Sequence, residues 1–151
     1  MKFPSFSSKS EEGLIDFHFE EVDFDFSQAH QIIQWITNTI NREGKSISRI
    51  QFIFCTDEYL HEINLKYLNH DTLTDIITFP YLENPIESDI FISIERVKEN
   101  AKTFGTTFEK ELHRIIIHGV LHMIGYGDKT PEEKSLMSKK ENEYLDYLVL
   151  N

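Results

Sequence analysis

The sequence predicts an α/β (α+β) fold in which a mostly mixed sheet of about four strands is covered by helices. Segments that alternate apolar and polar residues, or that are rich in β-branched residues, take turns along the chain with segments of helical periodicity. The 151 residues have a hydrophobic content of 40%, which is enough for one substantial core. No internal repeat or linker divides the chain, so residues 1–151 are expected to form a single domain. Residues 1–12, rich in serine and charge, are expected to be poorly ordered.

The first half of the chain is expected to contain two strands and two helices. Alternation over residues 13–20 predicts a strand, and the apolar run 47–55 predicts a second, buried strand. Between them, one apolar face predicts a helix that begins after Ser27 as its N-cap and ends near Gly44. Asp57 is expected to cap a further helix directly after the second strand.

A pair of neighbouring strands and a helix are expected next. Residues 75–81 and 89–94 are short β-branched runs, and the turn between them contains Asn84 and Pro85. This pattern predicts a hairpin or two adjacent strands. Residues from Glu95 to Phe104 have helical periodicity that stops at a glycine.

Two more helices complete the predicted fold. Thr107 is expected to begin a helix that is apolar on nearly every side, which predicts that this helix is buried. Residues 130–133, Thr-Pro-Glu-Glu, form a strong helix start with proline at the first helical position. This last helix is expected to run towards Leu150.

The buried helix carries the most informative segment, residues 118–128, HGVLHMIGYGD. His118 and His122 are four residues apart, so both imidazoles lie on one face of the helix. Gly125 can adopt the left-handed conformation that ends a helix, and the turn can bring Asp128 round as a third ligand. Three protein ligands with an open fourth position are typical of catalytic zinc. The site is expected to bind one divalent ion, most readily Zn²⁺. Ni²⁺, Mn²⁺ and Co²⁺ are alternatives, because the carboxylate oxygen of aspartate is a harder ligand than an imidazole nitrogen.

Two other readings of this segment follow from its residues. Its spacing is that of the metzincin pattern, but Gly119 stands where metallopeptidases have their glutamate base, which disfavours peptide hydrolysis. Glu111 is the same-face acid upstream that could replace that base. The histidines could also be structural, but two buried imidazoles need partners, and their spacing favours metal ligands.

Three segments, in order and spacing, resemble the YbeY family of metal-dependent endoribonucleases of ribosomal RNA maturation. They are residues 118–126 (HGVLHMIGY), 73–80 (LTDIITFP) and 88–93 (SDIFIS). The resemblance implies a cytoplasmic, single-strand-specific endoribonuclease that acts on ribosomal RNA precursors in ribosomal RNA maturation and ribosome quality control. It also implies a ribosomal subunit or ribosomal protein as a partner.

The same resemblance implies the residues of the site. His118, His122 and Asp128 would hold the ion, with His118, Asp75 and Thr78 as catalytic residues. Asp75 and Thr78 would line the active cleft. As purely structural alternatives, Asp75 could accept hydrogen bonds in a turn and Thr78 could be an ordinary strand residue. The ion would act on the RNA phosphodiester as a Lewis acid or by lowering the pKa of a bound water.

This chain departs from the family pattern at two informative positions. The family usually has histidine where this chain has Asp128, and most members carry an arginine linked to activity where it has Leu68. Lys66 and His70 are the nearest basic or polar residues that could replace the arginine. These departures leave open a non-catalytic, ribosome-associated metal-binding module. The open coordination position favours the enzyme.

Charge and composition set further limits. Acidic residues outnumber basic ones 26 to 15, for a net charge of −11. Because nucleic-acid affinity comes mainly from lysine and arginine, this balance argues against tight, unaided RNA binding and favours docking through a partner. Most basic residues follow Asp89, so a local basic cleft is an alternative. No membrane segment or secretory leader is expected, and the single cysteine, Cys55, excludes an internal disulfide and suits a reducing cytoplasm.

Overall fold

The computed structural model describes residues 14–68 and 74–150. The expectations about residues 1–12 and His70 therefore lie outside the described residues. The elements follow in the order β1 (Ile15–Phe19), α1 (Ala29–Arg42), β2 (Ile47–Cys55), α2 (Asp57–Leu68), β3 (Ile76–Glu83), β4 (Ile86–Ser93), α3 (Ile94–Phe104), α4 (Phe108–Ile124) and α5 (Pro131–Tyr147). Within these ranges no helix combines the length and apolarity that a membrane crossing needs.

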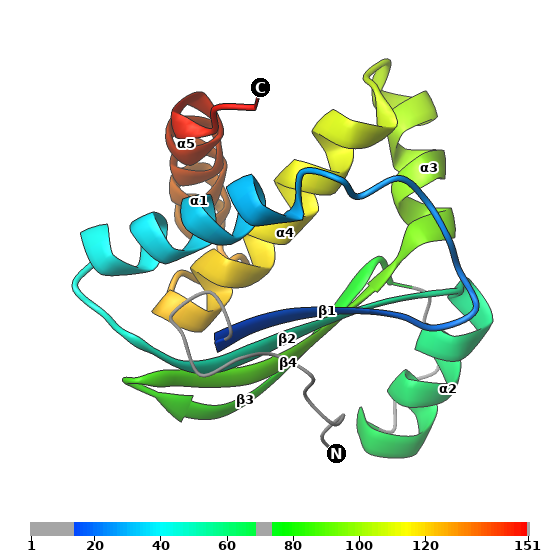
Figure 1. Ribbon diagram of the computed structural model, residues 1–151, viewed down its shortest axis with the longest axis horizontal. Coiled ribbons are helices and arrows are strands. Elements are labelled where there is room, and N and C mark those ends of the chain that lie inside the picture. Colours follow the sequence, from blue (N-terminus) through cyan, green and yellow to red (C-terminus); the bar gives the residue numbers. More distant parts are fainter. Residues whose placement is uncertain (1–13, 69–73, 151) are drawn as a thin grey trace.

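Four strands form one mixed sheet in the order β1-β2-β4-β3 (Figure 1). β1 and β2 are parallel, and so are β2 and β4, whereas β3 runs antiparallel to β4. The expected hairpin of neighbouring strands is therefore β3 and β4. The predicted fold class, an α+β protein with a mixed four-stranded sheet covered by helices, is confirmed.

The two faces of the sheet are covered unequally. Helices α1 and α4 lie on one face, with α5 packed on α4, and the shorter α2 covers part of the other face (Figure 1). The larger core fills the first side, and the smaller one lies under α2. Cys55 is buried in the smaller core at the end of β2, and burial raises the pKa of its thiol to about 12. It acts there as a small apolar residue.

Two of the expected helix caps are wrong. α1 begins after Gln28, which makes no side-chain cap hydrogen bond, and the backbone N–H of Ser27 donates instead to Asp25. α2 is capped by Thr56, whose hydroxyl accepts from the N–H of Tyr59. The side chain of Asp57 is not available for capping because it binds Ser93 and Arg96 of the neighbouring β4–α3 segment. The side chain of Asp57 is therefore used in a contact between distant segments.

Other local signals are confirmed. Thr107 caps α4 by accepting from the N–H of Lys110, and α3 ends at Gly105. Thr130 and Glu133 form a capping box at the start of α5, with Pro131 as the first helical residue. α5 ends at Tyr147. The segment that connects α4 to α5 is therefore bounded by two well-defined helix ends.

Helix α4 approaches the sheet closely at Gly119. A Cβ atom at this position would lie 2.9 Å from Cδ1 of Ile76 in β3 and 3.4 Å from Cγ2 of Ile90 in β4. Both distances are shorter than the usual separation of about 3.5–4.0 Å between packed carbon atoms. Glycine therefore sets the depth at which α4 lies on the sheet.

Replacing Gly119 by glutamate, the residue of the metallopeptidase pattern, is expected to lower the free energy of unfolding by about 3 kcal/mol. The new side chain would overpack the helix–sheet contact and bury a carboxylate without a partner. Gly119→Ala is the control, because the better helix propensity of alanine, about 1 kcal/mol, offsets the displacement of Ile76. Urea denaturation measures both variants. A glutamate variant as stable as the parent would show that the space above Ile76 and Ile90 is not restricted.

Candidate metal centre

Helix α4 holds two partly exposed imidazoles side by side in its second half. The rings of His118 and His122 lie with their centroids 4.6 Å apart. The side chains of His118 and His122 are 20% and 26% exposed, whereas most other residues of this half of the helix are buried. The i, i+4 spacing therefore places both rings on one partly open face of the helix, as expected.

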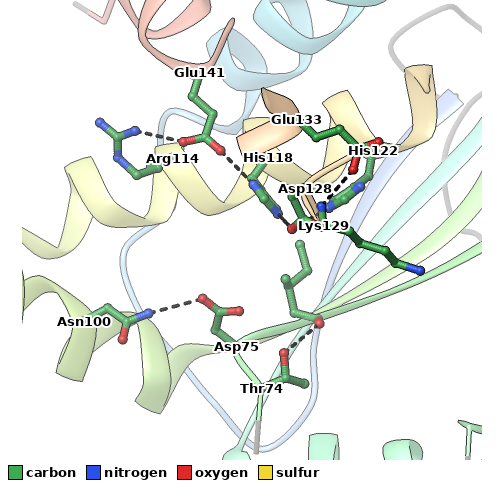
Figure 2. Close-up of polar contacts among 11 residues, drawn as sticks. Thr74, Asp75, Asn100, Arg114, His118, His122, Asp128, Lys129, Glu133 and Glu141 are labelled. Atoms are coloured by element: carbon green, nitrogen blue, oxygen red, sulfur yellow. Dashed lines mark hydrogen bonds and ion pairs between the residues drawn. The ribbon is translucent and has the colours of Figure 1, made fainter. Parts of the chain in front are cut away.

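The third predicted ligand reaches the same point. α4 ends at Gly125, which has a φ of 127°, and the chain turns back so that Asp128 faces the two rings (Figure 2). Oδ2 of Asp128 lies 3.4 Å from Nε2 of His118 and 3.2 Å from Nε2 of His122. The structure thus brings together the three residues that the sequence predicts as metal ligands.

The three residues fit a divalent ion. Their ligand atoms all lie within 4.8 Å of one another, and no other such cluster of metal-binding side chains occurs within residues 14–68 and 74–150. Two imidazole nitrogens and one carboxylate oxygen match the donors that zinc accepts, with room for a fourth ligand. The donor set is therefore that of a catalytic rather than a closed structural site.

A carboxylate from another helix orients His118. Nδ1–H of His118 donates to Oε2 of Glu141 in α5 at 2.7 Å, and the other oxygen of Glu141 accepts from Arg114 at 2.9 Å (Figure 2). Glu141 is only 7% exposed, so both of its bonds are largely shielded from water. Because Nδ1 bonds to Glu141, Nε2 is the nitrogen that faces Asp128 and His122.

Sequence reasoning did not identify Glu141 or Arg114. Glu141 lies 23 residues after His118 on a different helix, and no local spacing connects the two residues. Arg114 lies one turn before His118, but its role depends on where α5 packs. Only the tertiary structure reveals this arrangement.

The pKa of His118 reflects these neighbours. Burial lowers this pKa, but the hydrogen bond and charge of Glu141, with the charges of Asp128 and Asp75, raise it above the ordinary value of 6.5. The metal-free protein therefore holds a proton on His118 more firmly than an exposed histidine would. Because the metal-binding form of histidine is neutral, uptake of an ion must release that proton.

Asp75 and Thr78 lie on the sheet side of the site. Asp75 precedes β3, its carboxylate accepts from Asn100 in α3 at 3.2 Å, and Figure 2 shows it across from His118. Thr78 pairs with Ile90 in the sheet, and alternation along β3 places it on the same face as Ile76, which contacts α4. Neither residue belongs to the group of ligand atoms.

Three other polar residues make their contacts outside the group of ligand atoms. Asp89 lies within β4, where its buried carboxylate accepts from the hydroxyl of Tyr81. Lys66 is exposed on α2, on the sheet face opposite α4, with its ammonium group 5.4 Å from the ring of Tyr67. Tyr126 packs against the large core and donates its hydroxyl to Glu43.

A cavity of about 520 Å³ lies beside the first half of α4. Its lining includes Glu111 and Arg114, the residue that also holds Glu141, together with side chains from the ends of α3 and α5. Glu111 is buried, and burial with the charges of Asp75 and Glu141 raises its pKa, although Arg114 lowers it. The cavity thus begins one helical turn from the metal ligands.

Comparison with known proteins gives consistent matches. Residues 14–149 match the family model described as Endoribonuclease YbeY. The chain is 52% identical over 136 residues to Endoribonuclease YbeY of Christiangramia forsetii, covering 89% of this chain and 94% of the relative. It is 51% identical over 133 residues to the protein of the same name from Flavobacterium psychrophilum, covering 87% and 94%. The solution structure of TM1509 from Thermotoga maritima matches with a TM-score of 0.65 and 25% identity over 87% of this chain and 88% of that one.

Removing the carboxylate of Glu141 is expected to weaken metal binding by about 10- to 100-fold, because His118 loses the partner that orients it. Glu141→Gln, which keeps the shape of the side chain, should weaken metal binding by about tenfold, and Glu141→Ala should weaken it by about 100-fold. In the metal-free Glu141→Gln protein, the pKa of His118 should fall, since the carboxylate raises it. Chelator competition measures the affinity, and NMR titration of the imidazole measures the pKa.

Asp146→Asn is the matched control, because Asp146 is an exposed acid on the same helix. It should change neither quantity. Parental affinity and an unchanged pKa in both Glu141 variants would show that this carboxylate does not act on His118.

Proposed function

The chain belongs to the YbeY family of endoribonucleases, and we propose that His118, His122 and Asp128 hold the divalent ion on which its RNA cleavage depends. The protein is an RNA-cleaving hydrolase, a metal-dependent endoribonuclease that acts in ribosomal RNA maturation. The observation that carries the metal assignment is the convergence of both Nε2 atoms on Oδ2 of Asp128.

Zinc is the ion we assign to this site, with nickel, manganese and cobalt as alternatives. Two imidazoles and one carboxylate with an open position suit zinc, while the aspartate makes the site harder than one built of three histidines. A bound divalent ion supplies a Lewis acid for the negatively charged phosphodiester. The chain's own contribution is to orient His118, because Glu141 holds its Nδ1 proton and leaves Nε2 as the nitrogen that faces the ion.

Asp75 and Thr78 are assigned to the sheet-side wall of the cleft. Asn100 donates to Oδ2 of Asp75 and thereby orients this carboxylate, whose charge contributes to the raised pKa of His118. A carboxylate that faces the metal site from across the cleft can accept or return a proton during cleavage. Thr78 offers a hydroxyl on the same face of β3 as the residues that contact α4.

Loss of the metal ligands is expected to abolish RNA cleavage. His118→Ala/His122→Ala should reduce the rate on a labelled single-stranded RNA by at least about 100-fold in the presence of added Zn²⁺, because the Lewis acid is no longer held. Asp128→Ala should reduce it by at least about tenfold, since two ligands remain. Gel analysis of cleavage products against time measures the rates, and a duplex of the same sequence should be cut more slowly.

His30→Ala is the matched control, because His30 is an exposed histidine on α1. It should leave the rate unchanged. If the double histidine variant cleaves as fast as the parent, the metal site is not the catalytic site.

The RNA is proposed to be a ribosomal RNA precursor that the protein meets in the cytoplasm on a ribosomal subunit, through contact with a ribosomal protein. The net charge of −11 supports this proposal, because such a protein gains little affinity from free RNA phosphates. A reducing compartment also suits the single, unpaired Cys55.

Binding to ribosomal subunits is therefore expected to be at least about tenfold tighter than binding to free RNA, a difference of about 1.4 kcal/mol. Fluorescence anisotropy of the labelled, metal-loaded protein at one fixed salt concentration measures both dissociation constants. Equal or tighter binding to free single-stranded RNA would contradict the need for a ribosomal partner.

A further inference from the structure

The third metal ligand is carried by a turn and not by a helix. Residues 125–130, here called the ligand turn, connect α4 to α5 and contain neither helix nor strand. His118 and His122 are fixed by the packing of α4, whereas the position of Asp128 depends on what holds this turn. Two carboxylates from other parts of the chain hold it.

Glu133 holds the ligand turn on its C-terminal side. Its Oε1 accepts from the backbone N–H groups of Lys129, at 3.1 Å, and Thr130, at 3.0 Å. Its other oxygen lies against Gly127, where a Cβ atom would approach Oε2 to 2.5 Å. The carboxylate therefore contacts the residues on both sides of Asp128, and Figure 2 shows it beside the turn.

Glu43 holds the ligand turn on its N-terminal side. It follows α1, and its Oε1 accepts from the hydroxyl of Tyr126 at 2.6 Å. Its Oε2 accepts from the hydroxyl of Tyr144 and from Nζ of Lys140 in α5. The side chain of Glu43 is only 14% exposed, so this cluster is largely shielded from water.

An aspartate on an irregular turn helps to chelate an ion only if the turn keeps it in place. Fixing the backbone of such a segment costs conformational entropy, and a turn already fixed on folding does not incur that cost when the ion binds. Precision of this kind comes from residues that lock the supporting segment. The two carboxylates supply such locks from α1 and from α5.

We propose that Glu133 and Glu43 are positioning residues that hold the ligand turn so that Asp128 meets His118 and His122. This inference rests on the proposed metal site. Neither residue is a metal ligand, but both contribute to metal affinity. Glu133 acts through the backbone of the ligand turn, and Glu43 acts through Tyr126.

Glu133 also has a structural role that the test must separate. Together with Thr130 it forms the capping box of α5, so its removal weakens the start of that helix. Thr130→Ala removes the cap hydroxyl that accepts from the N–H of Glu133 but leaves the Glu133 carboxylate on the ligand turn. This variant should lose stability without a comparable loss of metal affinity.

The experiment measures Zn²⁺ affinity of the metal-free full chain by chelator competition, with the visible spectrum of the Co²⁺-loaded protein as a second readout. Glu133→Ala and Tyr126→Phe should each weaken binding by about tenfold, and the double variant should approach Asp128→Ala. Glu133→Gln, which keeps an acceptor oxygen, should restore most of the affinity. Thr130→Ala and Glu132→Ala, which alters an exposed acid next to Glu133, should stay within about twofold of the parent.

The other outcomes identify which assignment fails. If Asp128→Ala loses affinity while Glu133→Ala and Tyr126→Phe keep it, the positioning role is overturned and the metal site stands. If Thr130→Ala loses as much affinity as Glu133→Ala, the effect comes from the helix start, and the positioning role of Glu133 is overturned. If Asp128→Ala binds as tightly as the parent, the metal site itself is wrongly assigned. Should Glu133→Ala fail to fold, Tyr126→Phe decides, because parental affinity in that variant overturns the positioning role.

Discussion

Burial of helix α4 is the constraint on which the site depends. Its apolar side chains are covered by the sheet on one side and by α1 and α5 on the others, and Gly119 allows it to lie close to β3 and β4 (Figure 1). The strip that carries His118 and His122 is partly open. Because packing fixes the helix along its length, the distance between the two imidazoles is set before any ion binds.

Negative charge is gathered around this strip from several elements. Glu141 comes from α5, Asp128 from the ligand turn and Asp75 from the segment before β3, and each raises the pKa of His118. Such a site attracts a cation but would repel a phosphodiester. A bound divalent ion would offset two of these charges and Arg114 offsets a third, so the loaded site would no longer repel an anionic substrate. The overall charge of the protein and its action on RNA are therefore compatible.

Local patterns predicted much of this structure. The run 47–55 is the strand β2 without change of bounds, and the three predicted metal ligands lie together at the end of α4, as the i, i+4 spacing and the glycine indicated. What local patterns could not provide was any contact between distant segments. Glu141 reaches His118 across 23 residues, and Asp57 failed as a cap because Ser93 and Arg96 bind its side chain. Such pairings are decided by how helices pack, which no spacing within one segment reveals.

Anomalous diffraction from crystals of the zinc-loaded protein tests most directly whether two helix-borne imidazoles and one turn-borne carboxylate share a single ion. The account predicts one strong peak about 2.0–2.1 Å from Nε2 of both His118 and His122 and about 2.0–2.2 Å from a carboxylate oxygen of Asp128. Nδ1 of His118 should remain bonded to Glu141 in the same crystal. A peak at another cluster, or an ion bound without Asp128, would contradict the account.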